Sequence, residues 1–503
     1  MNAMTPAYCL PDENAPDVFL HALENYRGRI FLLDDGKTID SGELRDGWTK
    51  LIRRFGEFGL TPGDRIVVAV GNGPLFIAVW GAILACGGSP IPVHFETPPP
   101  ELNRIACRFH AAYLITDNFS EADMEAAESH AYTLECSSWG RIVWTDVYCD
   151  GRNPGLDADL LLPGISLHPT SGTTGLPKLA VRPMRTAVAE VVNYAKTFGF
   201  DADDTVLGTT PMSHAFAHGF CVIGPIITGA DLAVMRKFQP NLVATACRDL
   251  SITIIAAVAG VLDTLLFMGG TALKTSTRKV FSGAGPLSER TARQFQRITG
   301  ITPRPLLGST ETGGIAVAGE NEICTDGRVG RLFKGVAVRL QPYDENDRKL
   351  SMIQVRSESL MMGYLIDETL DTSSLDSGWF STGDLGHVDA GGTLFVHARA
   401  AEVVNVSGMK VLPREVEEVI LSLKSVREVK VFGHKNRSGS YQVRAAVVGD
   451  GVSADEIREH CKAQLVYFKI PAKIIMLDAL PKNANGKVIL AELENLVPGE
   501  ELS

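Results

Sequence analysis

The chain has 503 residues, of which 45% are hydrophobic and 21% charged, so it is long enough to bury two or three cores in a globular protein. Its net charge of −11 argues against general affinity for nucleic acids or anionic membranes, because those surfaces are themselves negative. No signal-peptide pattern is present and the nine cysteines form no CxxC pair, which indicates reduced thiols and cytoplasmic residence rather than a disulfide framework or zinc site. The longest apolar run, residues 252–268, is interrupted by polar side chains and therefore predicts a buried strand and helix, not a membrane span.

The first 150 residues alternate between helical and strand patterns. Apolar residues at helical spacing follow Ser41, and a buried strand pattern follows at residues 65–70. Further predicted elements are a helix over 75–86, a strand over 89–93, a helix from Pro98, and strands over 113–116 and 141–144. This βαβ rhythm is typical of an α/β protein.

A polar loop follows at residues 168–179, which read HPTSGTTGLPKL. Hydroxyls, open backbone N–H groups and a cation suit a polyphosphate, and they come from Thr170, Ser171, Gly172, Thr173, Thr174, Gly175 and Lys178. The Walker A pattern fails because Leu176 and Pro177 separate the second glycine from the lysine. Composition alone leaves a flexible polar linker open as the alternative.

Several short motifs come after this loop. They are PMSHAF at 211–216, SGAGPL at 282–287, LGSTETGG at 307–314, WFSTGDL at 379–385, ARAAE at 398–402 and PKNANGKVI at 481–489. Taken singly, each has an ordinary explanation: a lone histidine among apolar residues is usually a core residue, and Asn485-Gly486 suits a surface turn.

The last hundred residues have the pattern of a small α+β domain. Pro413 opens a predicted helix, residues 429–432 and 441–448 predict paired strands, and Ser453 with Glu456 predicts a capping box for a second helix.

In this order, the motifs resemble those of the adenylate-forming superfamily, which includes acyl- and aryl-CoA synthetases, adenylation domains of peptide synthetases, and luciferases. The resemblance covers residues 40 to 490 and is nearest to an acyl- or aryl-CoA ligase. It implies a large multi-subdomain α/β domain over residues 1–401, and a small mobile α+β lid domain over 402–503 with its hinge at Glu402. The implied reaction is activation of a carboxylic acid by ATP and Mg²⁺ through an acyl-adenylate with pyrophosphate release, followed by thioester formation with coenzyme A.

The resemblance also implies a role for particular residues. Thr310 would contact the α-phosphate, Glu311 would bind Mg²⁺, and Lys487 would bridge the substrate carboxylate and the α-phosphate. His214 would lie beside the acyl pocket. The other implied contacts are to phosphates from Thr170 to Gly175 and Lys178, to adenine from Gly283, Ala284 and Gly285, to ribose from Asp384, to ribose or phosphate from Arg399, and to coenzyme A from Gly408 and Lys410.

The substrate is less closely defined by the motifs. Ala215 stands where peptide-synthetase adenylation domains place an aspartate, and an unpaired buried ammonium would be costly, so an α-amino acid is disfavoured. The neighbouring residues predict a neutral pocket with a floor of small residues, suited to an aryl acid or a medium-length acyl chain; they are His214, Phe216, Gly283, Ala284, Gly285 and Gly308.

Two alternatives remain open from the sequence. A carrier-protein phosphopantetheine could replace coenzyme A as the acceptor. A non-catalytic relative that binds nucleotide or acyl groups is the second, because Leu179, Leu307 and Ala398 depart from the usual motif residues.

Overall fold

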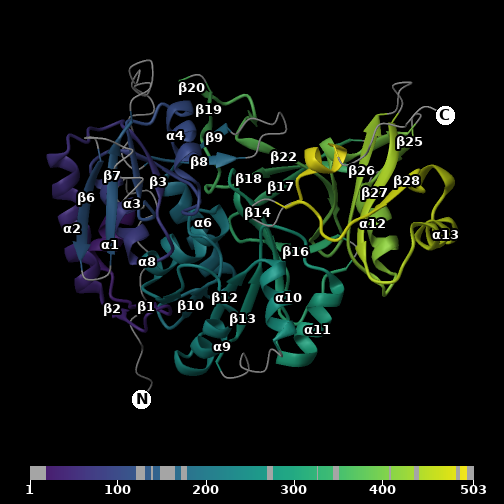
Figure 1. Cartoon of the computed structure of the whole chain (residues 1–503), viewed down its shortest axis with the longest axis horizontal. Coiled ribbons are helices and arrows are strands. Elements are labelled where there is room, and N and C mark those ends of the chain that lie inside the picture. The colour runs from purple at the N-terminus through teal and green to yellow at the C-terminus, as the bar shows by residue number, and fades with distance from the viewer. Residues whose placement is uncertain are drawn as a thin grey trace. The chain divides into compact units, whose positions relative to one another are not determined.

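The protein forms two compact units, shown in a computed structural model (Figure 1). The structure describes residues 18–119, 131–137, 140–147, 165–170, 178–268, 276–325, 327–343, 350–366, 368–406, 409–435, 441–482 and 488–495. The large unit comprises residues 1–325, 329–338 and 355–380, and the small unit comprises residues 326–328, 339–354 and 381–503.

The large unit contains a mainly parallel sheet. Its strands, in spatial order, are β2 (Thr38–Ile39), β1 (Ile30–Leu32), β11 (Asp231–Val234), β10 (Thr205–Gly208), β12 (Ile254–Ala257), β13 (Lys279–Ser282), β14 (Arg304–Ser309), β15 (Gly313–Val317) and β16 (Arg328–Leu332). The pairs from β1 to β14 are parallel, whereas β14, β15 and β16 pair antiparallel. Alternate residues enter different cores, as with Val206 and Leu207, because successive strand residues face opposite sides. Both faces of this sheet are therefore covered, as parallel strands require.

Helices cover the two faces of this sheet. One face packs on α9 (Pro240–Asp249), α10 (Ala259–Phe267) and α11 (Glu289–Thr299) (Figure 1). The opposite face shares a core with α1 (Val18–Asn25), α3 (Pro74–Ala85), α6 (Met184–Phe198), α7 (Ala215–His218), the π-helical turn η3 (Gly219–Ile223) and α8 (Gly224–Thr228). Helix α6 also contacts β15, so it lies against the turn that leads into that strand.

A second sheet confirms the predicted βαβ rhythm. Its strands are β4 (Ser89–Pro92), β3 (Arg65–Ala69), β5 (Tyr113–Thr116), β7 (Gly140–Asp146) and β6 (Ala131–Ser137), with α2 (Ser41–Glu57) and α4 (Pro99–Arg108) beside them. Strand β3 is parallel to β4 and β5. The predicted helix after Ser41 is α2, but it begins at Ser41 itself, and Asp40 is its N-cap in a capping box with Glu43.

A third, four-stranded sheet contributes directly to the site, and we call it the hairpin sheet. Its antiparallel strands are β20 (Thr369–Asp371), β19 (Gly363–Ile366), β9 (Lys178–Pro183) and β8 (Ile165–Thr170). One of its faces is apolar and buried, through Ile165, Leu167, Leu179, Val181 and Leu365. Since side chains alternate along a strand, the residues between these must lie on the opposite face.

The small unit confirms the predicted α+β pattern. Its sheets comprise β17 (Ala337–Pro342), β18 (Ser351–Arg356), β22 (Trp379–Val388) and β23 (Thr393–Arg399); β24 (Val404–Val406) and β25 (Met409–Val411); and β26 (Val426–Lys435), β27 (Tyr441–Gly449) and β28 (Lys473–Met476). The remaining short elements are β21 (Leu375–Asp376), which belongs to the large unit and pairs with the start of β22, and η5 (Ala400–Glu402), η6 (Tyr467–Lys469) and α14 (Leu490–Asn495). Pro413 opens α12 (Pro413–Leu421), and the capping box of Ser453 with Glu456 begins α13 (Ala454–Gln464).

Cysteine and membrane predictions have different outcomes. Cys86, Cys221, Cys247, Cys324 and Cys461 are free thiols, as expected. Cys107 on α4 is disulfide-bonded, so the prediction of reduced thiols is wrong at that position. Among the helices that the structure describes, none is long and apolar enough to cross a membrane.

Candidate active site

The predicted phosphate loop connects two paired strands of the hairpin sheet. Thr170 ends β8, Lys178 begins β9, and the two residues are direct partners across the antiparallel pair. The Thr170 hydroxyl donates to the carbonyl oxygen of Lys178 over 3.4 Å. The pair therefore fixes both ends of the connection, whereas the predicted contacts from Ser171 to Gly175 lie outside the described residues.

The polar face of the hairpin sheet carries chemically active side chains. On β8 and β9, His168 pairs with Ala180 and Ser166 pairs with Arg182, so these side chains share a face with Thr170 and Lys178. On β19, Tyr364 pairs with Ala180 and joins the same face. The sequence motifs do not single out His168, Arg182 or Tyr364, although the period-two alternation in residues 165–170 and 178–183 is a signal that points to His168 and Arg182.

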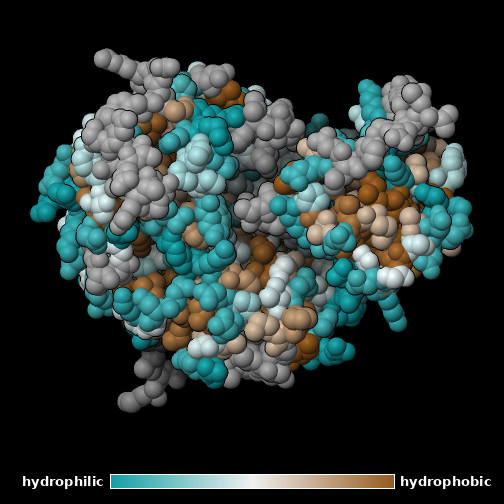
Figure 2. Space-filling view, in the orientation of Figure 1, coloured by the Kyte–Doolittle hydropathy of each residue, from teal (hydrophilic) through white to brown (hydrophobic). Residues whose placement is uncertain are grey.

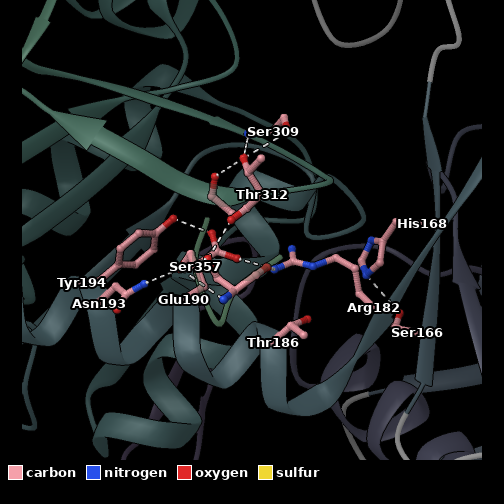
Figure 3. A network of polar contacts seen from close by, with 12 residues as sticks. Ser166, His168, Arg182, Thr186, Glu190, Asn193, Tyr194, Ser309, Thr312 and Ser357 are labelled. Carbon is pink, nitrogen blue, oxygen red and sulfur yellow. Dashed lines mark hydrogen bonds and ion pairs between the residues drawn. The ribbon is translucent and has the colours of Figure 1, made fainter. Parts of the chain in front are cut away.

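Arg182 on β9 forms a buried ion pair with Glu190, which lies on α6, the helix that directly follows this strand (Figure 3). Its Nη2 atom donates to Glu190 Oε2 over 3.0 Å and to the carbonyl oxygen of Ser359 over 3.3 Å. Tyr194, one turn further along α6, donates its hydroxyl to Glu190 Oε1 over 2.5 Å. The two charged side chains are only 4% and 5% exposed, so each needs the other as a neutralising partner.

The Thr310–Glu311 motif lies at the tip of the turn between β14 and β15. Thr312 closes the turn, since its hydroxyl accepts from the backbone N–H of Ser309 over 3.2 Å (Figure 3). Gly313 follows with φ of +66°, a left-handed conformation that favours glycine. A Cβ atom there would lie 2.8 Å from the Glu190 carboxyl carbon, so the buried ion pair packs directly against this turn.

Lys178 and Glu311 are brought together by Tyr364. The Tyr364 hydroxyl donates to Glu311 Oε1 over 2.8 Å, and the Lys178 ammonium lies 5.2 Å from the centre of the Tyr364 ring. The backbone N–H of Met361 donates to the Glu311 carbonyl oxygen over 2.8 Å. An anionic carboxylate and a cation therefore contact the same phenol side chain.

The surroundings of Glu311 fit a Mg²⁺ site whose ligands come partly from the protein and partly from substrate phosphates. Its Oε2 atom has no hydrogen-bond partner among the described residues, and the side chain is partly exposed. No group of three acidic, histidine or cysteine side chains gathers as a metal site within the part of the chain that the structure describes. Mg²⁺ commonly binds one or two carboxylates together with substrate phosphates, so a single free carboxylate oxygen suits it.

His214 lies at the start of a helix. It is the N-cap residue of α7, which begins at Ala215, so Pro211–Ser213 form the loop before the helix. Asn72 holds this loop: its Oδ1 atom accepts from the Met212 N–H over 2.7 Å, and its Nδ2 atom donates to the Thr210 carbonyl oxygen over 3.2 Å. Burial lowers the pKa of His214, so the ring is neutral at neutral pH.

Two further histidines lie buried nearby, and their rings are 5.3 Å apart. Burial lowers the pKa of His168 well below its usual range, and it lowers that of His218 to about 3. His218 Nδ1 donates to the Met212 carbonyl oxygen over 3.2 Å, which leaves Nε2 as a buried acceptor without a partner in the described structure. Both rings are therefore uncharged at neutral pH.

Two of the predicted pocket residues are in contact at the glycine-rich turn. The Phe216 ring packs on Gly283, where an added Cβ would lie only 2.5 Å from a ring carbon. Ala284 and Gly285 are exposed, and Ala284 adopts a φ of +63°. Gly308 is exposed and backs onto Gly313, whose carbonyl oxygen would lie 2.5 Å from an added Cβ. Side chains at the two glycines would thus displace an aromatic ring or backbone.

The small unit brings Asp384 and Arg399 together. They are direct partners across β22 and β23, and Arg399 Nε lies 2.8 Å from Asp384 Oδ1. Arg399 also donates to the Thr382 carbonyl oxygen over 3.0 Å. Asp384 is buried whereas the Arg399 side chain is 51% exposed, so the pair presents a positive edge to solvent.

The predicted hinge residue has a cationic partner in the same unit. Lys430 Nζ lies 3.0 Å from Glu402 and 3.2 Å from Glu417. Burial lowers the pKa of Lys430, but the two carboxylates outweigh that effect and raise it above its ordinary value. The ion pair fixes the side chain of Glu402.

Of the two predicted coenzyme A residues, Lys410 lies on β25, which pairs with β24 in a hairpin. Lys410 lies 4.6 Å from the centre of the Tyr343 ring, and Gly408 lies outside the described residues, as does Lys487. Beside the hairpin is a groove of about 390 Å³ with Val406, Met409, Gln442, Val443, Tyr467, Phe468, Ile470 and Ala472 along its walls. Apolar side chains also gather on the surface of the small unit shown in Figure 2.

Comparisons with known proteins match most of the chain. The family model described as AMP-binding enzyme matches residues 19–365, and the model described as AMP-binding enzyme C-terminal domain matches residues 415–487. The chain is 25% identical to 4-coumarate–CoA ligase 5 of Oryza sativa subsp. japonica over 97% of this chain and 95% of that protein. It is 26% identical to the fatty acid–[acyl-carrier-protein] ligase ScoC of Streptomyces coeruleorubidus over 93% of each chain. The solved o-succinylbenzoate CoA synthetase of Bacillus subtilis, in complex with its acyl-adenylate intermediate, shares the fold with a TM-score of 0.81 at 22% identity, over 97% of this chain and 99% of that chain.

Proposed function

The chain belongs to the family of AMP-binding enzymes, and from that premise we propose that it is an acid–thiol ligase that activates a carboxylic acid with ATP and transfers it to coenzyme A. One observation carries the proposal. Lys178, the first residue of β9, and Glu311, in the turn between β14 and β15, both contact Tyr364. A cation and a carboxylate oxygen without a partner among the described residues, close to one another, are what a magnesium-bound triphosphate needs.

In the first step, the substrate carboxylate attacks the α-phosphorus of ATP and pyrophosphate leaves. Two anions must approach each other, so the protein's contribution is positive charge and orientation, not a nucleophile. Lys178 and the loop from Thr170 to Gly175 would hold the leaving phosphates, and Thr310 would hold the α-phosphate. Lys487 would hold the substrate carboxylate against it.

Mg²⁺ would be held by Glu311 together with the nucleotide's phosphates, and when bound it would neutralise charge that develops on the phosphate oxygens. Glu311 Oε1 is already occupied by the Tyr364 hydroxyl, so the second oxygen is the one offered to the cation. The ribose would be held by Asp384 and Arg399, and the adenine would lie against Gly283, Ala284 and Gly285.

In the second step, the thiol of coenzyme A attacks the acyl carbonyl carbon and AMP leaves. We propose the domain boundary at residues 401 and 402, with the lid rotating at Glu402 so that Lys487 leaves and the β24–β25 hairpin approaches. Val406 and Met409 pair across this hairpin and line the neighbouring groove, which supports a contact between the hairpin and the apolar part of the pantetheine arm. Lys410 would bind an anionic group of the cofactor.

An aryl acid or a medium-length acyl acid is the substrate class that we propose. The close packing of Phe216 on Gly283 and the neutral ring of His214 support an acyl pocket with an aromatic, uncharged wall. We place the reaction in the cytoplasm, where ATP and coenzyme A are available. Transfer to a carrier-protein phosphopantetheine is the second candidate, favoured by the similarity to a ligase named for an acyl carrier protein.

The Lys487→Ala variant tests this function. We expect pyrophosphate release to fall by about 10² or more, by comparison with the loss of other preorganised charge stabilisers. Lys482→Ala is the matched control, because Lys482 lies in the same motif but pairs with Glu428. Release at the rate of the unaltered protein from Lys487→Ala would refute the assignment of this lysine.

A further inference from the structure

A short segment of the large unit forms hydrogen bonds with two residues of the turn between β14 and β15, Glu311 and Thr312. The Ser359 hydroxyl donates to the Thr312 carbonyl oxygen over 2.7 Å, and the Met361 N–H donates to that of Glu311 over 2.8 Å. Tyr364, on β19, adds the hydrogen bond to the Glu311 carboxylate itself. Residues 359–364, which the motifs do not include, therefore fix both the backbone and the side chain of the turn.

This segment is itself anchored to the strand that begins at Lys178. Strand β19 pairs with β9, and the carbonyl oxygen of Ser359 accepts a hydrogen bond from Arg182. Because Tyr364 is the register partner of Ala180, Lys178 is its diagonal neighbour on the same face. The geometry thus makes Tyr364 a direct link between the phosphate-loop strand and the turn.

The Tyr364 side chain has two separable parts. Its hydroxyl occupies Glu311 Oε1, which orients the carboxylate and leaves Oε2 for another ligand. Its ring lies 5.2 Å from the Lys178 ammonium, within the range of a cation–π contact that restricts where this long side chain can reach. Removing a side chain that forms a hydrogen bond to a metal-binding residue commonly weakens metal affinity by about 10- to 100-fold.

We propose that Tyr364 is a positioning residue for this site: its hydroxyl presets Glu311 for a divalent cation, and its ring presets Lys178 for the nucleotide phosphates. The inference rests on the proposed function, since it takes Glu311 as the cation ligand. It adds to that function a residue from another strand whose two parts serve two different ligands.

The experiment uses two substitutions in the full chain and measures binding as well as turnover. Tyr364→Phe removes the hydroxyl and keeps the ring, whereas Tyr364→Leu removes both. Mn²⁺ binding in the presence of ATP is followed by the electron paramagnetic resonance signal of free Mn²⁺, and ATP binding without metal is followed by calorimetry. The Mg²⁺ concentration for half-maximal pyrophosphate release gives the kinetic counterpart.

We expect Tyr364→Phe to weaken Mn²⁺ binding by about tenfold and to leave metal-free ATP binding unchanged, because the contact with Lys178 is kept. Tyr364→Leu should weaken both. Tyr113→Phe is the matched control, since its hydroxyl donates to the carbonyl oxygen of Gly59 over 3.4 Å, away from the turn. It should behave as the unaltered protein.

Unchanged Mn²⁺ affinity in Tyr364→Phe would overturn the proposal, provided that Glu311→Gln weakens Mn²⁺ binding in the same assay. If Glu311→Gln also binds Mn²⁺ with the original affinity, the assignment of the cation ligand in the proposed function fails instead, and the role of Tyr364 fails with it. Equal loss of metal-free ATP binding in the Phe and Leu variants would show that Tyr364 only maintains the fold, and would likewise overturn the proposal.

Discussion

Replacement of Glu190 by glutamine tests whether the buried ion pair holds the large unit together. Glu190→Gln keeps the shape of the side chain but leaves the Arg182 guanidinium without its charge partner in a site where Arg182 is 4% exposed. Removal of one partner of a buried ion pair costs about 3–5 kcal/mol, because an uncompensated charge remains. Tyr194 retains an acceptor in the amide oxygen, so the lost charge is the main change.

The assay is urea unfolding followed by tryptophan fluorescence. All five tryptophans belong to the large unit, so the signal reports on the unit that contains the mutation. Glu289→Gln is the matched control: Glu289 pairs with Arg293 over 2.6 Å on the exposed face of α11, where such pairs contribute about 0.3–0.5 kcal/mol.

A second variant keeps the argument testable if Glu190→Gln does not fold. In Arg182→Met with Glu190→Leu, both charges are absent, and we expect the free energy of unfolding to lie within about 2 kcal/mol of the original, since apolar replacement of buried pairs is often neutral or better. A loss below about 1 kcal/mol in Glu190→Gln alone would contradict the reasoning, because it would mean that water or another group neutralises Arg182.

Two further predictions concern the small unit and pH. Gly408→Leu should spoil thioester formation while it spares adenylation, because a side chain there would block the close passage of the pantetheine arm; equal loss of both half-reactions, measured separately, would count against it. The pKa of His218 falls from its ordinary 6.5 to about 3 in the folded chain, so below pH 6.5 the unfolded chain binds a proton that the folded chain does not. Stability should therefore decline by about 1.4 kcal/mol per pH unit for this histidine as the pH falls from 6.5 towards 3, and should not change through this group above 6.5. Urea unfolding between pH 5 and 6.5 measures how the free energy of unfolding depends on pH. His218→Gln should lower the number of protons taken up on unfolding by up to one, and an unaltered pH dependence would contradict the prediction.

The sequence predicted the family because its motifs are local in the chain. Each motif is a run of a dozen residues or fewer, as at 168–179, 307–314 and 379–385. The family match confirms the prediction of an AMP-binding enzyme. The roles assigned to the individual residues remain predictions.

The contacts behind the motifs could not be predicted, because they join distant segments. Tyr364 reaches Glu311 across 53 residues, and Arg182 reaches Ser359 across 177. The departure at Leu179 now has a physical reason: its side chain is 1% exposed in the apolar core on the far face of the hairpin sheet, opposite to Lys178. A leucine there fills the core and does not enter the phosphate side.

Pyrophosphate release from MgATP tests the central claim most directly, with a panel of aryl, short, medium and long aliphatic acids and amino acids, each with and without coenzyme A. We predict that one class of aryl or medium acyl acids gives turnover, that amino acids do not, and that coenzyme A raises the rate as thioester accumulates. Adenylate formation without any response to coenzyme A would favour a carrier-protein acceptor. Binding of ATP with no acid-dependent release across the whole panel would contradict the ligase assignment.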